Sequence, residues 1–462
     1  MKLKKPWVWT ADFLSYFVCL TVLVESIKAN CPHPAVPYAA TYSNVTYDPQ
    51  NWSIKYVCDR GYTIFGEQER NCVNGKWKGD LPICAVNVAL HKPAKSSSVT
   101  NGGQASNAVD GRTSTVHEGR QCTETKSEKS PWWTVDLLVP VKVQHVRLTT
   151  RCCDDLPLKN AEIRVGNSTE PTNNPLCTWI PKALDEGITE TFDCVEPLTG
   201  QYVSVLRSGV EAVLSLCEVE VFSTHGLSIA SCSEAANPDD LAVFDDSCFH
   251  FLSTEVSGFE EATEKCAEEN YALLNNLTDA SKTFITSKVD QERDDSKSLM
   301  LWLGAKRHRT NFRGEEWRWT ETDGKVESIE WGRGQPNNYN QEQNCAVLDS
   351  DLDWGWNDLS CKISAKVICR GRPSRCPSPP TAEGTSVTLD GQMLTYHCSL
   401  GQMPIGEVNQ TCGADGKWDG FPIGCKPVDC GQVPGEFTIF VPNSMYLISN
   451  LFWVFIYRFG QW

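Results

Sequence analysis

Two short segments of the chain carry side-chain oxygens in a pattern that suits a hard divalent cation. Gln335 and Asn337 flank Pro336 and offer two amide oxygens, and the adjacent pair Asn357 and Asp358 offers an amide and a carboxylate. Calcium binds oxygen ligands of these kinds in flexible geometry. A cation held by them would retain coordination positions for two neighbouring hydroxyl groups of a ligand, which the same side chains could also hydrogen-bond.

Other classes of chemistry find little support in the sequence. It contains no Gly-x-Ser-x-Gly, His-Glu-x-x-His or phosphate-binding loop, and its eight histidines are scattered. We therefore expect that the protein is not an enzyme. The formal net charge of −16 opposes the approach of a phosphate backbone, so we expect no nucleic-acid partner.

The cysteine content and the N-terminal segment both indicate a secretory route. The chain has 22 cysteines, a density typical of disulfide-bonded extracellular proteins. Basic residues followed by a short apolar run predict a signal peptide over residues 1–29, with an N-terminal membrane anchor as the alternative. The run is shorter than the ~20 residues that a spanning helix needs. Sequons for N-glycosylation begin at Asn44, Asn51, Asn167, Asn276 and Asn409.

The spacing of the cysteines divides the rest of the chain into modules. Beyond Cys19, they fall into groups of four, six, six and four, and Cys430 is left over. Because each group is even, we expect each module to close its own bridges. Short apolar stretches between Gly, Asn and Pro turns predict a multidomain, mostly β protein, with one amphipathic helix over 259–270. The expected modules are 31–84, 85–225, 230–371 and 376–425, followed by a tail over 428–462.

The first and fourth modules share a pattern of four cysteines with Gly-Lys-Trp before the last one, at Gly75–Trp77 and Gly416–Trp418. This pattern resembles the sushi module, also called the complement control protein module, a small β fold. The resemblance implies the pairs Cys31–Cys72, Cys58–Cys84, Cys376–Cys412 and Cys398–Cys425. A core this small depends on such bridges for stability.

The second module contains the segments Ser106–Gly111, Pro131–Leu137 and Ala161–Asn167 in that order. This ordered set resembles the F-type, fucose-binding lectin family, which implies a β jelly roll similar to the discoidin domain. The resemblance implies the bridges Cys122–Cys217, Cys152–Cys153 and Cys177–Cys194. It also implies a structural calcium ion held by Asn107, Asp110 and Glu218; the alternative is that Asn107 and Asp110 only cap turns.

The fucose site of this family, which uses a histidine and two arginines, is altered here. Arg151 keeps the place of the first arginine, whereas Glu124 stands where the histidine belongs and Pro157 where the second arginine belongs. His117 could substitute for the histidine, or could simply be a solvated loop residue. We therefore expect weak or absent fucose binding.

The third module contains Phe259-x-x-Ala262-x-x-x-Cys266, Trp302–Ala305, Gln335–Asn337 and Trp356–Asp358. These motifs resemble the C-type lectin domain, an α+β fold. The resemblance implies the pairs Cys232–Cys248, Cys266–Cys369 and Cys345–Cys361, and a cis peptide bond before the proline of the first ligand segment. A calcium-free, protein-binding domain that keeps remnants of the motifs is the alternative.

The resemblance implies a calcium site with Gln335, Asn337, Asn357 and Asp358 as ligands of both metal and sugar. The family's fifth ligand, an acidic residue two positions before a cysteine, corresponds here to Gln343, and we expect the neighbouring Glu342 to serve instead. With so few carboxylates the calcium affinity should fall in the weak extracellular range, with a Kd of ~10⁻⁴–10⁻³ M. Gln-Pro-Asn lies between the mannose and galactose patterns. Tyr339 could stack on a sugar such as galactose or be an ordinary loop aromatic.

The tail begins as a further sushi module would, but three of its cysteines are missing, so a longer form could continue to a membrane anchor. Cys430 could then form a disulfide dimer. The module order resembles that of insect selectin-like adhesion proteins. It implies an extracellular protein that uses calcium to bind glycans or glycoproteins on cells. The alternatives are a protein-binding adhesion scaffold with relic sugar sites and a complement-like regulator.

Overall fold

A computed structural model describes most of the chain between residues 31 and 427. The described ranges are 31–46, 52–100, 102–115, 121–153, 157–232, 237–292, 297–310, 314–327, 329–399 and 402–427. Several expectations lie outside them: the signal peptide, Asn51, His117 and the tail with Cys430. Within the described ranges, no helix has both the length and the apolar character needed to cross a bilayer.

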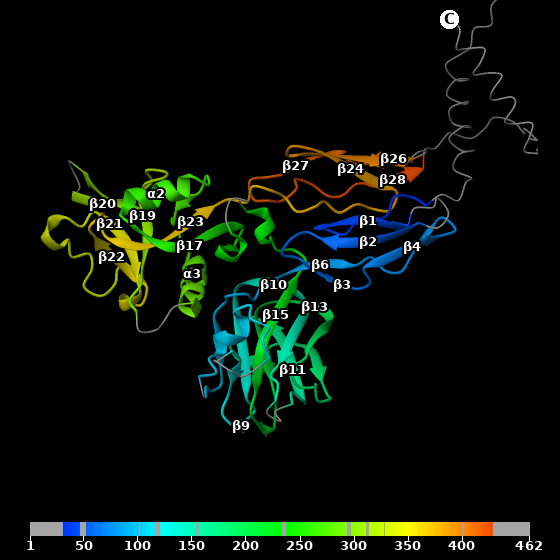
Figure 1. The fold of residues 1–462 in the computed structure, drawn as a ribbon, viewed down its shortest axis with the longest axis horizontal. Coiled ribbons are helices and arrows are strands. Elements are labelled where there is room, and N and C mark those ends of the chain that lie inside the picture. The colour runs from blue at the N-terminus through cyan, green and yellow to red at the C-terminus, as the bar shows by residue number, and fades with distance from the viewer. Residues whose placement is uncertain are drawn as a thin grey trace, which may run out of the picture. The chain divides into compact units, whose positions relative to one another are not determined.

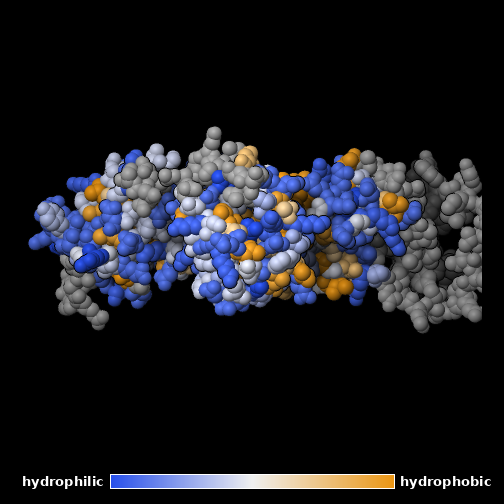
Figure 2. All heavy atoms as spheres, turned by 90° about the horizontal axis from the view of Figure 1, so that it is seen from below, coloured by the Kyte–Doolittle hydropathy of each residue, from blue (hydrophilic) through white to orange (hydrophobic). Residues whose placement is uncertain are grey.

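The protein is a mostly β, multidomain chain, as the sequence predicts (Figure 1). Among the described residues, ten disulfides join the pairs that the family resemblances imply. They are Cys31–Cys72, Cys58–Cys84, Cys122–Cys217, Cys152–Cys153, Cys177–Cys194, Cys232–Cys248, Cys266–Cys369, Cys345–Cys361, Cys376–Cys412 and Cys398–Cys425. Hydrophilic residues predominate on the face drawn in Figure 2, with hydrophobic residues in small patches between them.

Two modules, the first and the last, are each a small set of antiparallel strands around a few buried side chains. The first has β1 (Ala40–Thr46), β2 (Ser53–Cys58), β3 (Thr63–Phe65), β4 (Glu69–Val73), β5 (Lys76–Lys78) and β6 (Ile83–Asn87). The last has β24 (Thr385–Asp390), β25 (Met393–Cys398), β26 (Gln402–Ile405), β27 (Asn409–Thr411) and β28 (Gly424–Pro427). Trp77 lies in the first core, where its indole nitrogen donates to the carbonyl of Pro32 at 2.9 Å.

The second module is a β jelly roll with a continuous apolar core. Its elements are β7 (Ala94–Ser96), η1 (Ala105–Val109), β8 (Thr123–Glu124), β9 (Glu128–Lys129), β10 (Trp132–Thr150), β11 (Ala161–Gly166), η2 (Pro171–Asn173), β12 (Leu176–Ile180), β13 (Thr189–Leu206), β14 (Glu211–Ala212) and β15 (Ser215–Ser223). The strands β12, β11, β13, β10 and β15 pair in that order (Figure 1). Alternating residues of these strands point into the core, with Trp133 and Ile163 fully buried.

The third module is an α+β domain built on one mixed sheet with the order β16-β17-β23-β19-β21-β22. Its elements are β16 (Leu241–Phe244), β17 (Ser247–Ser257), α2 (Phe259–Ala267), β18 (Ala272–Leu273), α3 (Asp279–Glu292), β19 (Met300–Thr310), β20 (Gly314–Trp319), η5 (Tyr339–Gln341), β21 (Cys345–Asp349), η6 (Ser350–Leu352), β22 (Gly355–Leu359) and β23 (Ser364–Gly371). Short turns η3 (Ile229–Ser231) and η4 (Pro238–Asp240) precede it.

The helices of this domain differ from the sequence prediction in one respect. α2 forms where expected and buries Phe259, Ala262 and Cys266 on one face. The second helix, α3, is absent from the prediction, because few of its residues are apolar. Its buried face mixes Phe284 and Ile285 with polar residues, so a hydrophobic repeat is hard to recognise.

Candidate functional site

The oxygen-rich turn of the C-type lectin domain is held closed by one buried carboxylate. Asp358, on β22, is fully buried, and its Oδ1 accepts a hydrogen bond from the backbone N–H of Asn337 at 2.8 Å. Its Oδ2 accepts from the N–H of Asn338, also at 2.8 Å. The peptide bond between Gln335 and Pro336 is cis. The structure therefore joins the two predicted ligand segments directly.

Two of the predicted ligands present buried oxygens that have no hydrogen-bond donor. These atoms are Oε1 of Gln335 and Oδ1 of Asn357, and Oδ1 of Asn338 beside them is in the same state. The Asn357 amide is oriented because its Nδ2 donates to Oδ2 of Asp349 at 2.9 Å. A buried acceptor without a donor costs free energy, and a cation within reach of these oxygens would satisfy them. This donor set therefore fits calcium, which accepts amide oxygens.

Two other predicted ligands, Asn337 and Glu342, lie at the surface. Asn337 is exposed, and its Oδ1 accepts from the N–H of Tyr339 at 3.0 Å. Glu342 is exposed on the same loop, whereas Gln343, the family's usual position, contacts the turn by accepting from the N–H of Tyr339 at 2.5 Å.

Of the aromatic residues near the turn, one lies at the surface and two lie in the core. Tyr339 is 70% exposed and stands next to the ligand segment, so its ring is open to contact with a ligand. Trp354 and Trp356 are buried, and the Trp354 indole nitrogen donates to Asp290 at 3.0 Å. The two tryptophans therefore serve packing, and Tyr339 is the aromatic available for stacking on a sugar.

Sequence reasoning missed Arg307, which lies on β19 and pairs with Asp358. The side chains are 5% and 0% exposed, and the Arg307 guanidinium carbon lies 5.2 Å from the ring centroid of Trp317. The pair is separated by 51 positions in the chain, and no motif connects the two residues. Asn338 was also missed, although it follows the Gln-Pro-Asn segment directly.

The predicted calcium site of the jelly roll brings two carboxylates together. Glu218 on β15 accepts from the N–H of Gly111 at 3.1 Å through Oε1, while its buried Oε2 has no donor. Burial, and then the nearby charge of Asp110, raise the pKa of Glu218 to about 9. Burial also raises the pKa of Asp110. Buried Glu218, with one unsatisfied oxygen, and partly exposed Asp110 nearby together fit a calcium ion that neutralises them.

Asn107 lies near this pair on η1, where it holds neighbouring backbone in place. Its Nδ2 is 3.3 Å from the carbonyl oxygen of Gly102 and 3.2 Å from that of Cys122. The amide nitrogen therefore supports the loop that precedes Asp110. This contact also links the calcium-binding candidate to the disulfide Cys122–Cys217.

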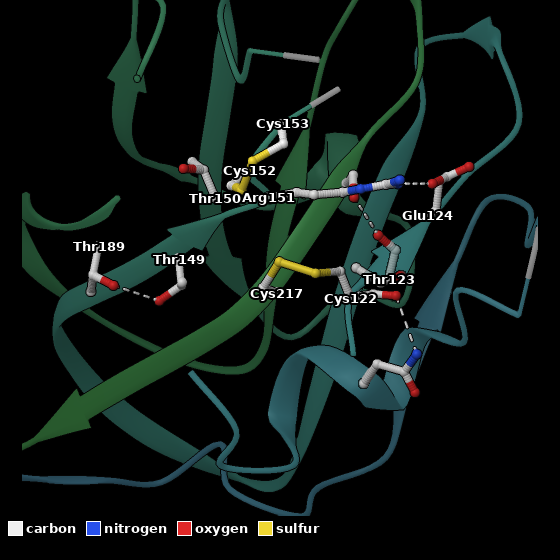
Figure 3. The surroundings of a disulfide bond; sticks show 12 residues. Cys122, Thr123, Glu124, Thr149, Thr150, Arg151, Cys152, Cys153, Thr189 and Cys217 are labelled. Carbon is white, nitrogen blue, oxygen red and sulfur yellow. Dashed lines mark hydrogen bonds and ion pairs between the residues drawn. A yellow bond between two sulfur atoms is a disulfide. The ribbon is translucent and has the colours of Figure 1, made fainter. Parts of the chain in front are cut away.

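The altered fucose site is occupied by an internal ion pair. Arg151 follows β10 and extends to Glu124 on β8, and the two side chains form a buried ion pair beside the disulfide Cys152–Cys153 (Figure 3). Both residues are 8% exposed. Pro157, at the position of the second arginine, offers no side-chain donor. The donors that would face a fucose ring are thus reduced to one guanidinium that is already paired.

This pairing predicts that Glu124→Ala strengthens fucose binding. Releasing a charged donor is expected to improve the affinity for free fucose about tenfold, since a hydrogen bond to a charged group contributes about 1.5–3 kcal/mol. Ligand-observed NMR titration of the full chain measures the change, and Glu128→Ala on β9 is the control. Equal fucose affinity in the wild type and the Glu124 variant would show that the ion pair does not block the site.

Three family models match parts of this chain. Residues 31–84 match the family described as "Sushi repeat (SCR repeat)", residues 107–205 the "NedA-like, galactose-binding domain", and residues 255–371 the "Lectin C-type domain". The two lectin-type domains support carbohydrate binding, and the many disulfides among the described residues fit an extracellular protein.

Curated relatives resemble the chain over about a third of its length. Fucolectin-4 of Anguilla japonica is 43% identical over 145 residues, which cover 29% of this chain and 78% of the relative. Fucolectin of Anguilla anguilla is 38% identical over 145 residues, which cover 29% of this chain and 89% of the relative. The crystal structure of a fucolectin from Morone saxatilis serum is 26% identical, covers 62% of this chain and 90% of its own, and has a TM-score of 0.29. Through its jelly-roll domain, the chain belongs to the fucolectin family.

Proposed function

We propose that the protein is a calcium-dependent, carbohydrate-binding adhesion protein of the cell surface or extracellular space. The proposal rests above all on one observation, the buried and unsatisfied oxygens of Gln335 and Asn357 beside the carboxylate of Asp358. When bound, calcium supplies a Lewis acid to which sugar hydroxyls bind directly. Gln335, Asn337 and Asn357 would hold the ion and orient the hydroxyls, and exposed Tyr339 would pack on the apolar face of the sugar.

The module order supports a selectin-like role in adhesion, similar to that of the insect protein furrowed. In this arrangement the C-type lectin domain binds a glycan on another cell, and sushi modules extend the chain away from the membrane. A longer form would anchor the protein at the cell surface, and Cys430 would join two copies. The partners are glycans or glycoproteins, and the jelly roll adds a second recognition surface.

Glycan-array screening of the full chain with calcium and with EDTA tests this proposal. We expect signals that EDTA and free monosaccharide abolish, and that Gln335→Ala reduces at least about tenfold, since one ligand amide contributes roughly 1.5 kcal/mol. Gln341→Ala removes the same side chain from an exposed position of the same loop and serves as the control. Signals that survive both EDTA and Gln335→Ala would contradict a lectin function of this domain.

A specific observation favours a second candidate function, a protein-binding adhesion scaffold with relic sugar sites. In the jelly roll, Glu124 takes the guanidinium that fucose would use. If the sugar sites of the whole chain are relics, protein partners should still bind when EDTA removes calcium, and free monosaccharide should not compete with them. The array with its EDTA arm, together with capture of a glycan-free protein partner, distinguishes the two functions.

A further inference from the structure

The calcium-site candidate of the C-type lectin domain contains a positive charge of its own. Asp358 is the buried carboxylate of the turn, and besides two backbone N–H groups it binds Nη2 of Arg307 at 2.5 Å. Both of its oxygens are therefore engaged by groups of the same chain. The negative charge that would attract a divalent ion is balanced within the protein.

Arg307 is held firmly in this position. Its backbone N–H donates to the carbonyl of Asn344 at 2.9 Å, which ties β19 to the residue before β21. The guanidinium carbon lies 5.2 Å from the ring centroid of Trp317 on β20, a distance typical of a cation–π contact. A guanidinium keeps its proton in proteins, so this charge is permanent at any physiological pH.

Two other carboxylates belong to this region in the part of the chain that the structure describes. Glu342 is exposed on the loop, and Asp349, which is 8% exposed, is engaged by the Asn357 amide and by the N–H of Asp351. A calcium ion bound to Gln335 and Asn357 would thus share the Asp358 carboxylate with a fixed positive charge. Two cations that share one buried carboxylate repel each other, and the repulsion is only partly screened.

We propose that Arg307 is a resident cation of this site. It neutralises Asp358 so that the turn from Gln335 to Asn338 stays closed in the absence of metal, and it keeps the calcium affinity low. The first part stands on the contacts of Arg307 alone, and the second part rests on the proposed calcium-dependent function. Calcium would then complete a site that is already ordered, and sugar binding would follow the extracellular calcium concentration.

Arg307→Gln tests the proposal, with Arg318→Gln as the matched control. Arg318 lies on β20 of the same hairpin, carries the same charge, and pairs with Glu316 and Asp323 instead of the site. Hydrogen exchange of the full chain, read on peptides that cover 333–343, reports the order of the turn separately from the jelly roll. We expect Arg307→Gln to exchange at least about tenfold faster in EDTA, and to gain protection at a calcium concentration about tenfold lower than the wild type.

The outcomes separate the two parts of the proposal. The proposed role of Arg307 would be overturned if Arg307→Gln showed the same protection in EDTA and the same calcium midpoint as the wild type. An equal effect of Arg318→Gln would also overturn it. Faster exchange in EDTA with no calcium response in any variant would support the resident cation, while the calcium-dependent function would fail.

A second variant covers the case in which Arg307→Gln unfolds the whole domain, as seen by lost protection in β17 and β23. Arg307→Lys keeps the charge and should leave the calcium midpoint within about threefold of the wild type. A midpoint about tenfold lower in this lysine variant would overturn the proposal.

Discussion

Asp358→Ala is expected to destabilise the C-type lectin domain by about 3–5 kcal/mol, the usual cost of removing one partner from a buried ion pair. The change leaves the Arg307 guanidinium buried without its carboxylate, and it removes the acceptor of the N–H groups of Asn337 and Asn338. Amides of β21 and β22 should then exchange about 100- to 5,000-fold faster, as measured by peptide-resolved hydrogen exchange of the full chain.

Two further variants define the origin of this loss. Asp351→Ala removes a carboxylate from an exposed position on the preceding turn and should change exchange by less than about threefold. Asp358→Asn keeps one acceptor oxygen and should give an intermediate result. An Asp358→Ala protein whose β22 amides exchange as slowly as those of the wild type would show that the buried ion pair contributes little.

Glu218→Gln is expected to abolish the stabilisation of the jelly roll by calcium. The buried Oε2 of Glu218 lacks a donor, and burial, followed by the nearby charge of Asp110, raises the pKa of Glu218. A bound ion would relieve this repulsion and stabilise the folded domain by about 2.7 kcal/mol at a calcium concentration 100 times the Kd. The neutral amide of the glutamine removes the negative charge that attracts the ion. It also removes the repulsion by Asp110 that exists when no ion is bound.

The order of the two melting temperatures should therefore depend on the metal. In EDTA the Glu218→Gln variant should melt at a temperature equal to or above that of the wild type, whereas in calcium the wild type should melt higher. Differential scanning calorimetry of the full chain measures both. Glu220→Gln, two residues along β15, removes a carboxylate that pairs with Arg147 and should leave the calcium shift in place. A calcium shift that persists in Glu218→Gln would place the ion elsewhere.

Much of this fold can be predicted because its constraints are local in sequence. Cysteine groups of even size mark the modules, and short motifs such as Gln335–Asn337 are by themselves typical of the C-type lectin domain. The helix α2 is predictable because Phe259, Ala262 and Cys266 follow helical spacing. By contrast, α3 buries Ser281 and Lys288 beside its apolar residues, so its pattern resembles that of a polar segment.

The interactions that decide how the sites behave join distant residues. Arg307 on β19 reaches Asp358 on β22, with β21 between them in the sheet. Arg151, just after β10, reaches Glu124 on β8, a strand that pairs with β15. Glu124 is recognisable in the sequence as a change of charge at the fucose site, but its ion pair depends on the way β10 and β8 are brought together. Neither pairing follows from spacing, because a buried charge selects its partner by position in the folded domain.

The most direct measurement is the number of calcium ions bound per chain, determined by isothermal titration calorimetry. We expect the wild-type protein to bind one ion more than Gln335→Ala, and also one ion more than Glu218→Gln, because each substitution removes a different site. The Gln335→Ala protein should bind the jelly-roll ion with unchanged affinity. An ion count that Gln335→Ala leaves unchanged would contradict the claim that the oxygens of the C-type lectin turn hold calcium.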